Sequence, residues 1–250
     1  MKKAFFTSKN IAYLGILTAL EVVLLFFGSA VPVGSGGATL NFSLVPIVIG
    51  GILLGPVAGG LLGLISGIVI AIMVVTGLQG PVFLFLFQHQ PFMIVLICLV
   101  KTTAAGAVSG LLYRVIAKKN RHVAVFVSAL SAPVVNTGIF ILGCLCISGA
   151  VELSAAEFGL GYNSAFAVII LVFVTWNFFI EFAINLIIAP ALSRVVTIAE
   201  KYILKKKIRK PQAEQAEAFA EESGSGKNNE PAVPVEDNGS GASKETHIEV

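Results

Sequence analysis

Long apolar runs, interrupted by short polar or glycine- and proline-rich stretches, fill about the first 200 residues of the chain. About 20 apolar residues are needed to cross a bilayer as a helix, and most of the runs reach or approach that length. The pattern predicts an all-α integral membrane protein in which residues 11–210 form a bundle of six transmembrane helices. The predicted helices are residues 11–27, 39–54, 56–76, 91–117, 123–148 and 164 to about 189, the second being short for a span.

The segments between these helices differ in character. Residues 31–38 contain a proline and four consecutive small residues, which predicts a sharply bending loop that can serve as a lid. Residues 77–90 hold an apolar stretch that is too short to cross the membrane, so we expect it to lie at the membrane surface. Residues 149–163 contain acidic but no basic residues, as is typical of an outer loop.

The basic residues indicate how the bundle is oriented. Lys and Arg cluster before the first helix and at residues 118–122 and 201–210. Short basic loops face the cytoplasm, and six helices place all three clusters on that side. Both termini are therefore expected to be cytoplasmic, with residues 1–10 as a short N-terminal segment. The first helix also has features of a secretory signal, but its length and the presence of Glu21 favour an uncleaved helix.

The composition supports the same class of protein. Hydrophobic residues make up 56% of the chain and charged residues 12%, which is too apolar for one water-soluble domain. The formal net charge is +3, but most of the 14 acidic residues lie beyond Pro211. Residues 211–250 are therefore predicted to form a disordered, acidic, cytoplasmic tail. Because the basic residues lie at the ends of apolar runs, lipid and not nucleic acid is the expected partner.

No motif for catalysis or for a resident cofactor stands out. The three cysteines lie in apolar runs and the three histidines are scattered, so neither a disulfide framework nor a metal site is expected. The chain has no Gly-x-x-x-x-Gly-Lys-Ser/Thr phosphate loop and no HExxH helix. We therefore expect no enzymatic activity, no cofactor and no metal, and any energy that the protein uses would come from a partner.

Three ionisable residues lie inside the predicted helices: Glu21, Lys101 and Glu181. Such residues are costly in a membrane and usually face the bundle interior, a cavity or one another. Lys101 lies about 15 Å along its helix from the start at Pro91, given the helical rise per residue, so its ammonium group needs an anion. Glu21, Glu181 and a carboxylate on a bound ligand all remain possible partners.

Asparagines and aromatic residues supply further candidates for a binding site. Asn177, Glu181 and Asn185 recur at four-residue spacing on one face of the last helix; the alternative, favoured for Asn185, is that they only hold helices together. Trp176 and Tyr162 offer flat surfaces for a ring, although Tyr162 also suits an aromatic belt at the membrane boundary. The candidate substrate-binding residues are Asn41, Lys101, Asn136, Tyr162, Asn163, Trp176, Asn177 and Glu181.

Four short motifs occur in a characteristic order. They are FSLVPI at 42–47, GILLGPVAG at 51–59, GAVSGLLYR at 106–114 and NLIIAP at 185–190. Together they resemble the substrate-binding S components of energy-coupling factor (ECF) vitamin importers. The resemblance covers about residues 11–200 and does not reach the tail.

The resemblance implies a six-helix component of an ATP-driven importer that captures a water-soluble vitamin at a bacterial cell membrane. It implies a coupling transmembrane subunit and two ATPase subunits as partners, with the small pair Gly15 and Ala19 on the first helix as docking residues, unless that pair only packs internally. Lys101 suits an anionic substrate such as pantothenate, whereas the aromatic residues suit a flavin such as riboflavin. The alternative function is a stand-alone ion-coupled carrier of small solutes, with Glu21, Lys101 or Glu181 as ion sites.

Overall fold

The computed structural model describes residues 8–33, 38–39, 41–194 and 197–198. All of them belong to one structural unit, Met1–Ala199. Most of the predicted N-terminal segment 1–10, the basic cluster 201–210 and the predicted tail 211–250 lie outside the described residues.

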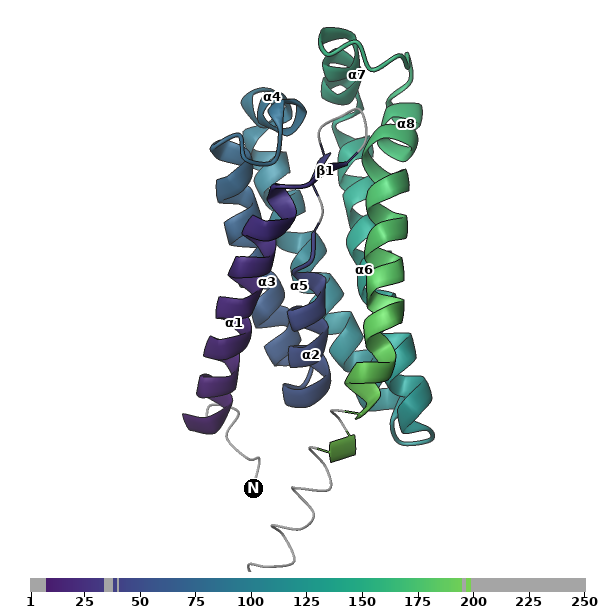
Figure 1. The fold of residues 1–250 in the computed structure, drawn as a ribbon. Helices are drawn as coiled ribbons and strands as arrows, with labels where there is room; N and C mark the ends of the chain where they lie inside the picture. Colours follow the sequence, from purple (N-terminus) through teal and green to yellow (C-terminus); the bar gives the residue numbers. More distant parts are fainter. Residues whose placement is uncertain (1–7, 34–37, 40, 195–196, 199–250) are drawn as a thin grey trace, which may run out of the picture. The chain divides into compact units, whose positions relative to one another are not determined.

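Helices account for nearly all of the described residues (Figure 1). They are α1 (Ser8–Ser29), α2 (Leu44–Leu54), α3 (Pro56–Val75), α4 (Pro81–His89), α5 (Pro91–Ile116), α6 (Arg121–Cys146), α7 (Ser148–Glu157), α8 (Ala165–Ala167) and the π-helical segment η1 (Val168–Val174). The helix that begins with α8 and η1 continues to Arg194. Within the loop after α1, strands β1 (Pro32–Val33) and β2 (Ala38–Thr39) form a short antiparallel pair. The predicted all-α class is therefore confirmed.

Five of the helices are long and apolar enough to cross a membrane. They are Asn10–Ser29, Pro56–Val75, Pro91–Ile116, Arg121–Cys146 and Ala165–Arg194. The remaining apolar helix, α2, has only 11 residues, less than the roughly 20 that a full span requires. Five of the six predicted transmembrane helices therefore have the length of a span, and the predicted count of six is not confirmed.

Proline and glycine set the helix boundaries. Pro56, Pro81 and Pro91 each stand at the start of a helix, where the missing N–H costs no hydrogen bond and the fixed φ suits the first turn. Gly55 separates α2 from α3 with a φ of 103°, a backbone conformation that favours glycine. These residues explain why the apolar region from residue 39 to residue 75 folds as two helices instead of one.

Glycines on α3 let its backbone lie directly against that of α5. A Cβ atom added at Gly59 would collide with the backbone of Gly106, and one added at Gly63 would collide with the backbone of Thr102. One turn further along, a Cβ at Gly67 would lie 2.7 Å from the carbonyl oxygen of Cys98. Small residues allow this approach in a membrane, where no hydrophobic force drives helices together. The close contact between the α3 and α5 backbones therefore depends on these glycines.

The short elements gather at one end of the helix bundle. In Figure 1, β1, α4, α7 and α8 lie at the end opposite to the start of α1.

The prediction of a loop at 149–163 was wrong in its first half, because α7 occupies Ser148–Glu157. Val151, Ser154 and Ala155 recur at helical spacing and are buried, since α7 packs on α4 and α8. Helix α5 begins directly after α4, and helix α6 ends directly before α7. The loop that joins α5 to α6 therefore lies at the other end of the bundle.

Candidate functional site

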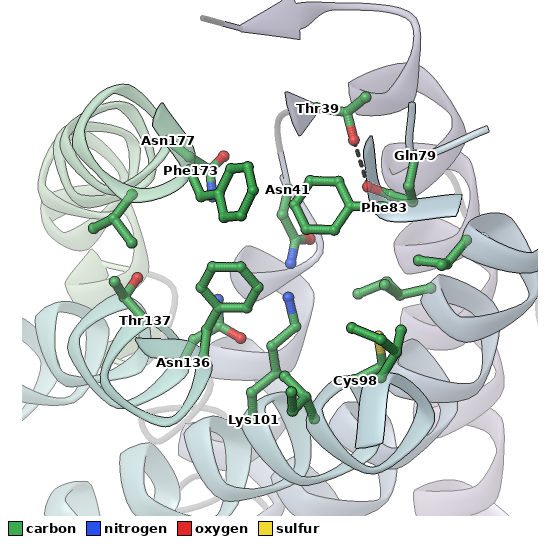
Figure 2. A pocket seen from close by; sticks show the side chains of 16 residues that line it. Thr39, Asn41, Gln79, Phe83, Cys98, Lys101, Asn136, Thr137, Phe173 and Asn177 are labelled. Carbon is green, nitrogen blue, oxygen red and sulfur yellow. Dashed lines mark hydrogen bonds between the residues drawn. The ribbon is translucent and has the colours of Figure 1, made fainter. Parts of the chain in front are cut away.

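A cavity lies between the helices, and its lining includes Gln79 and Phe83, just before and within α4. Figure 2 shows this cavity from close by. Its lining comes from the segment around β2, from α3 to α6, and from the last long helix. The polar lining residues are Thr39, Asn41, Gln79, Lys101, Asn136, Thr137 and Asn177. The Thr39 hydroxyl donates a hydrogen bond of 2.6 Å to Oε1 of Gln79. This bond ties the chain after the predicted lid loop to the turn between α3 and α4.

Three phenylalanine rings form part of the apolar cavity wall, which also contains aliphatic side chains of α3 and α5. The ring of Phe83 lies 5.2 Å from that of Phe173 and 6.2 Å from that of Phe140, centroid to centroid. The rings of Phe140 and Phe173 are 6.4 Å apart. Each ring comes from a different element: α4, α6 or η1. The three rings offer flat faces on which an aromatic ligand can pack.

Lys101 brings a positive charge into this cavity from α5. Its ammonium nitrogen lies 5.1 Å from the centroid of the Phe140 ring, within the range of a cation–π interaction. Within the part of the chain that the structure describes, Lys101 forms no ion pair with Glu21 or Glu181, although its charge acts on Glu181 from a distance. Of the three partners left open by the sequence, neither glutamate is in direct contact, and the third, a carboxylate on a bound ligand, is not tested by the structure.

Three asparagine side chains each leave one polar atom without a partner. Buried atoms lacking a hydrogen bond are Nδ2 of Asn41, Oδ1 of Asn136 and Oδ1 of Asn177. The Asn41 oxygen, by contrast, accepts bonds from the backbone N–H and the hydroxyl of Ser43 at 3.1 and 2.6 Å. Because buried polar groups are normally paired, these atoms mark positions where a ligand can bind: one donor and two acceptors.

Glu181 lies behind the cavity and orients one of the asparagines. The Asn177 amide nitrogen donates a 2.9 Å hydrogen bond to Oε1 of Glu181, and the Asn185 amide donates to the Glu181 backbone oxygen at 2.9 Å. Glu181 is only 2% exposed and is not part of the cavity lining. The predicted polar face of the last helix therefore exists, and Glu181 acts in it by holding Asn177 so that the Asn177 oxygen stays free.

The structure brings together half of the predicted binding residues. Asn41, Lys101, Asn136 and Asn177 line the cavity, whereas Tyr162, Asn163, Trp176 and Glu181 do not. The Trp176 side chain is 60% exposed and points away from the bundle, and Tyr162 and Asn163 are exposed near the start of the last helix.

Sequence reasoning missed the three phenylalanines and the polar residues Thr39, Gln79 and Thr137. A usable signal was present for two of the rings. Phe140 lies four residues after Asn136, and Phe173 lies four residues before Asn177. Residues at this spacing share a helix face, so each ring could have been paired with its asparagine.

The predicted docking residues lie on the outer surface of α1. Gly15 and Ala19 are both exposed, and a Cβ at Gly15 would meet no atom within 4 Å. The pair is therefore not used to pack helices within the described part of this chain. Exposed apolar side chains, including Tyr13, Ile16 and Leu20, surround it.

No cluster of three or more His, Cys, Asp or Glu side chains suited to a metal ion occurs among the described residues. Cys98 and Cys144 are buried and Cys146 is exposed, all as free thiols.

Comparison with known proteins adds one finding. Residues 9–193 match a family model described as "ECF transporter, substrate-specific component". No curated protein matches the chain.

Proposed function

This chain belongs to the substrate-specific components of ECF transporters, and we propose that its cavity binds a flat heteroaromatic vitamin of the riboflavin class. The family supplies the role, which is binding of a small transported substrate. One observation supports the substrate class. Three phenylalanine rings, Lys101 and amide atoms without hydrogen-bond partners line the same cavity. Ligand sites commonly combine apolar walls with a few placed polar groups in this way.

The chemistry of a flavin matches both parts of the wall. Its fused ring is planar and can pack against Phe83, Phe140 and Phe173. The carbonyl oxygens on the edge of the ring suit the donors of Asn41 and Lys101, and its N–H and hydroxyl groups suit the free amide oxygens. Pantothenate has a carboxylate for Lys101 but no ring for the phenylalanines, so we place it second.

The charge pattern supports an outward-facing cavity. Lys118, Lys119 and Arg121 lie at or next to the loop between α5 and α6, at the end of the bundle away from the cavity. Since short basic loops face the cytoplasm, the cavity end then faces outward. With six helices, α2 included, both termini are cytoplasmic and the chain is a multi-pass protein of the cell membrane.

We further propose that α1 docks on a coupling transmembrane subunit, which in turn is driven by two ATPase subunits. The exposed pair Gly15 and Ala19 permits close approach of a second helix, and nothing in the described part of the chain covers Gly15. Replacing Gly15 by leucine is expected to abolish co-purification of the coupling subunit, because the new side chain holds the helices apart. Riboflavin binding should remain unchanged, since Gly15 is not part of the cavity lining.

Gly149→Leu serves as the matched control, because Gly149 on α7 also has open space around it but lies on a different helix. The amount of coupling subunit recovered with each variant is measured by pull-down from membranes that contain the native partners. Equal recovery of the coupling subunit with Gly15→Leu and with the unaltered protein would remove α1 as the docking helix.

Mass spectrometry of small molecules retained by the purified protein tests the substrate class. The proposal predicts a flavin, released on denaturation in proportion to the protein. Recovery of pantothenate or another compound without an aromatic ring would replace the riboflavin class, while leaving the family role intact.

A further inference from the structure

Glu21 is buried in a helix that is otherwise largely exposed. Its side chain is 0% exposed, and neither carboxylate oxygen has a hydrogen-bond partner. The helix α1 packs mainly against α2 and α3, and neither of these helices contains an ionisable residue. A carboxylate ion without a counter-charge is very costly in such surroundings. Glu21 is therefore a neutral, protonated acid, which can donate a hydrogen bond.

A row of hydroxyl groups leads from Glu21 to the cavity. The Ser66 side chain approaches the Glu21 carboxyl group, and the Ser66 oxygen lies 2.8 Å from the hydroxyl oxygen of Ser43. The Ser43 hydroxyl in turn donates a 2.6 Å hydrogen bond to Oδ1 of Asn41. Both serines are fully buried, so water does not compete for these bonds. The structure contains no hydrogen bond between Glu21 and Ser66, and such a bond would complete the row.

The hydrogen atoms in this row can point in only one direction. The Asn41 oxygen is an acceptor, so the single hydroxyl proton of Ser43 goes to Asn41. Ser66 must then donate to Ser43, which leaves the Ser66 oxygen free only to accept. A protonated Glu21 is the donor that fits, whereas an ionised Glu21 would compete for the Ser66 proton. The two hydrogen bonds thus both run from Ser66 towards the cavity, and a bond donated by Glu21 would continue in the same direction.

This direction fixes how Asn41 faces the cavity. With its oxygen held by Ser43, Asn41 presents its NH₂ group, and Figure 2 shows that nitrogen pointing toward the Lys101 ammonium group. Both groups are donors only, and the Asn41 nitrogen is buried without a partner. An acceptor atom placed between them satisfies both.

We propose that protonated Glu21 is a positioning residue that acts through Ser66 and Ser43 to turn the Asn41 NH₂ group toward Lys101. The two groups form a subsite for one electronegative oxygen of the substrate. The subsite rests on the proposed function, but the state of Glu21 and its link to Ser66 do not. Because Glu21 belongs to α1, the same row of hydrogen bonds connects the proposed docking helix with the cavity.

Infrared spectroscopy of the ligand-free protein tests the protonation and the link. Glu21→Gln should remove a carbonyl band of a protonated carboxylic acid, and Ser66→Ala should shift that band to higher frequency, because the acid loses its acceptor. Glu181→Gln identifies any band that belongs to the other buried acid. A spectrum that is the same with and without Glu21 would overturn the proposal, and so would a Glu21 band that does not respond to Ser66→Ala.

Riboflavin titration tests the positioning role. Glu21→Gln keeps a donor for Ser66 and should bind riboflavin as the unaltered protein does, whereas Glu21→Met should weaken binding about tenfold, the usual effect of leaving a buried partner unsatisfied. Equal affinity of the Gln and Met variants would contradict the positioning role. Failure of the unaltered protein to bind riboflavin would refute the substrate class, and the infrared result would still decide the link to Ser66.

Discussion

Replacing Lys101 by methionine is expected to weaken riboflavin binding by roughly 10- to 100-fold, which corresponds to the about 1.5–3 kcal/mol of a hydrogen bond to a charged group. Methionine keeps the length and apolar stem of lysine but removes the charge that no described carboxylate neutralises. The same change should raise the melting temperature of the ligand-free protein, because an unpaired ammonium group inside a helix bundle is costly. Loss of affinity together with a gain in stability would show that Lys101 serves substrate binding and not the stability of the fold. Quenching of riboflavin fluorescence measures the affinity.

Arg114→Met is the matched control for this experiment. Arg114 is also a cation on α5, but it is exposed and lies in the last turn, far from the cavity. Its replacement should leave the affinity unchanged. If Lys101→Met binds riboflavin as tightly as the unaltered protein, the ammonium group does not contact the substrate.

Replacing Gly63 by alanine is expected to destabilise the membrane domain severely. The added methyl group would meet the carbonyl oxygen and carbon of Thr102 on α5, and backbone atoms cannot turn aside as a side chain can. Overpacking of a tight interior commonly costs about 1–3 kcal/mol and sometimes more, and here two long helices must separate to relieve it. The fraction of protein that stays monodisperse in detergent during heating reports the effect.

Gly60→Ala provides the comparison within the same helix. A Cβ at Gly60 would lie 3.6 Å from the Cβ of Ala107, an ordinary contact, so this variant should melt close to the unaltered protein. Similar melting of the Gly60 and Gly63 variants would show that close backbone contact between α3 and α5 does not limit stability.

The helices could be predicted from the sequence because their ends carry local signals. The lengths of the apolar runs predicted the membrane-spanning helices. Prolines at the first helical position set the starts of α3, α4 and α5. The helix α7 gave no such signal. Its ten residues are held as a helix by packing on α4 and α8, and that surface exists only after the chain has folded.

Half of the candidate site could be predicted, because a polar residue in an apolar run stands out. Lys101, Asn136 and Asn177 were found in this way. The sequence did not reveal how the last helix is rotated about its own axis, and hence which of its residues face the cavity. Its π-helical segment Val168–Val174 has wider turns than an α-helix, which shifts the faces of the residues that follow. Trp176 consequently points outward while Asn177 and Phe173 face the cavity.

Uptake of riboflavin into liposomes tests most directly whether this chain supplies a binding site without a motor. Liposomes that contain the chain together with the coupling subunit and both ATPases should accumulate riboflavin when ATP is present. Liposomes that contain the chain alone should bind riboflavin but not concentrate it, with or without an ion gradient. Accumulation against a gradient by the chain alone would contradict this account and establish an ion-coupled carrier in its place.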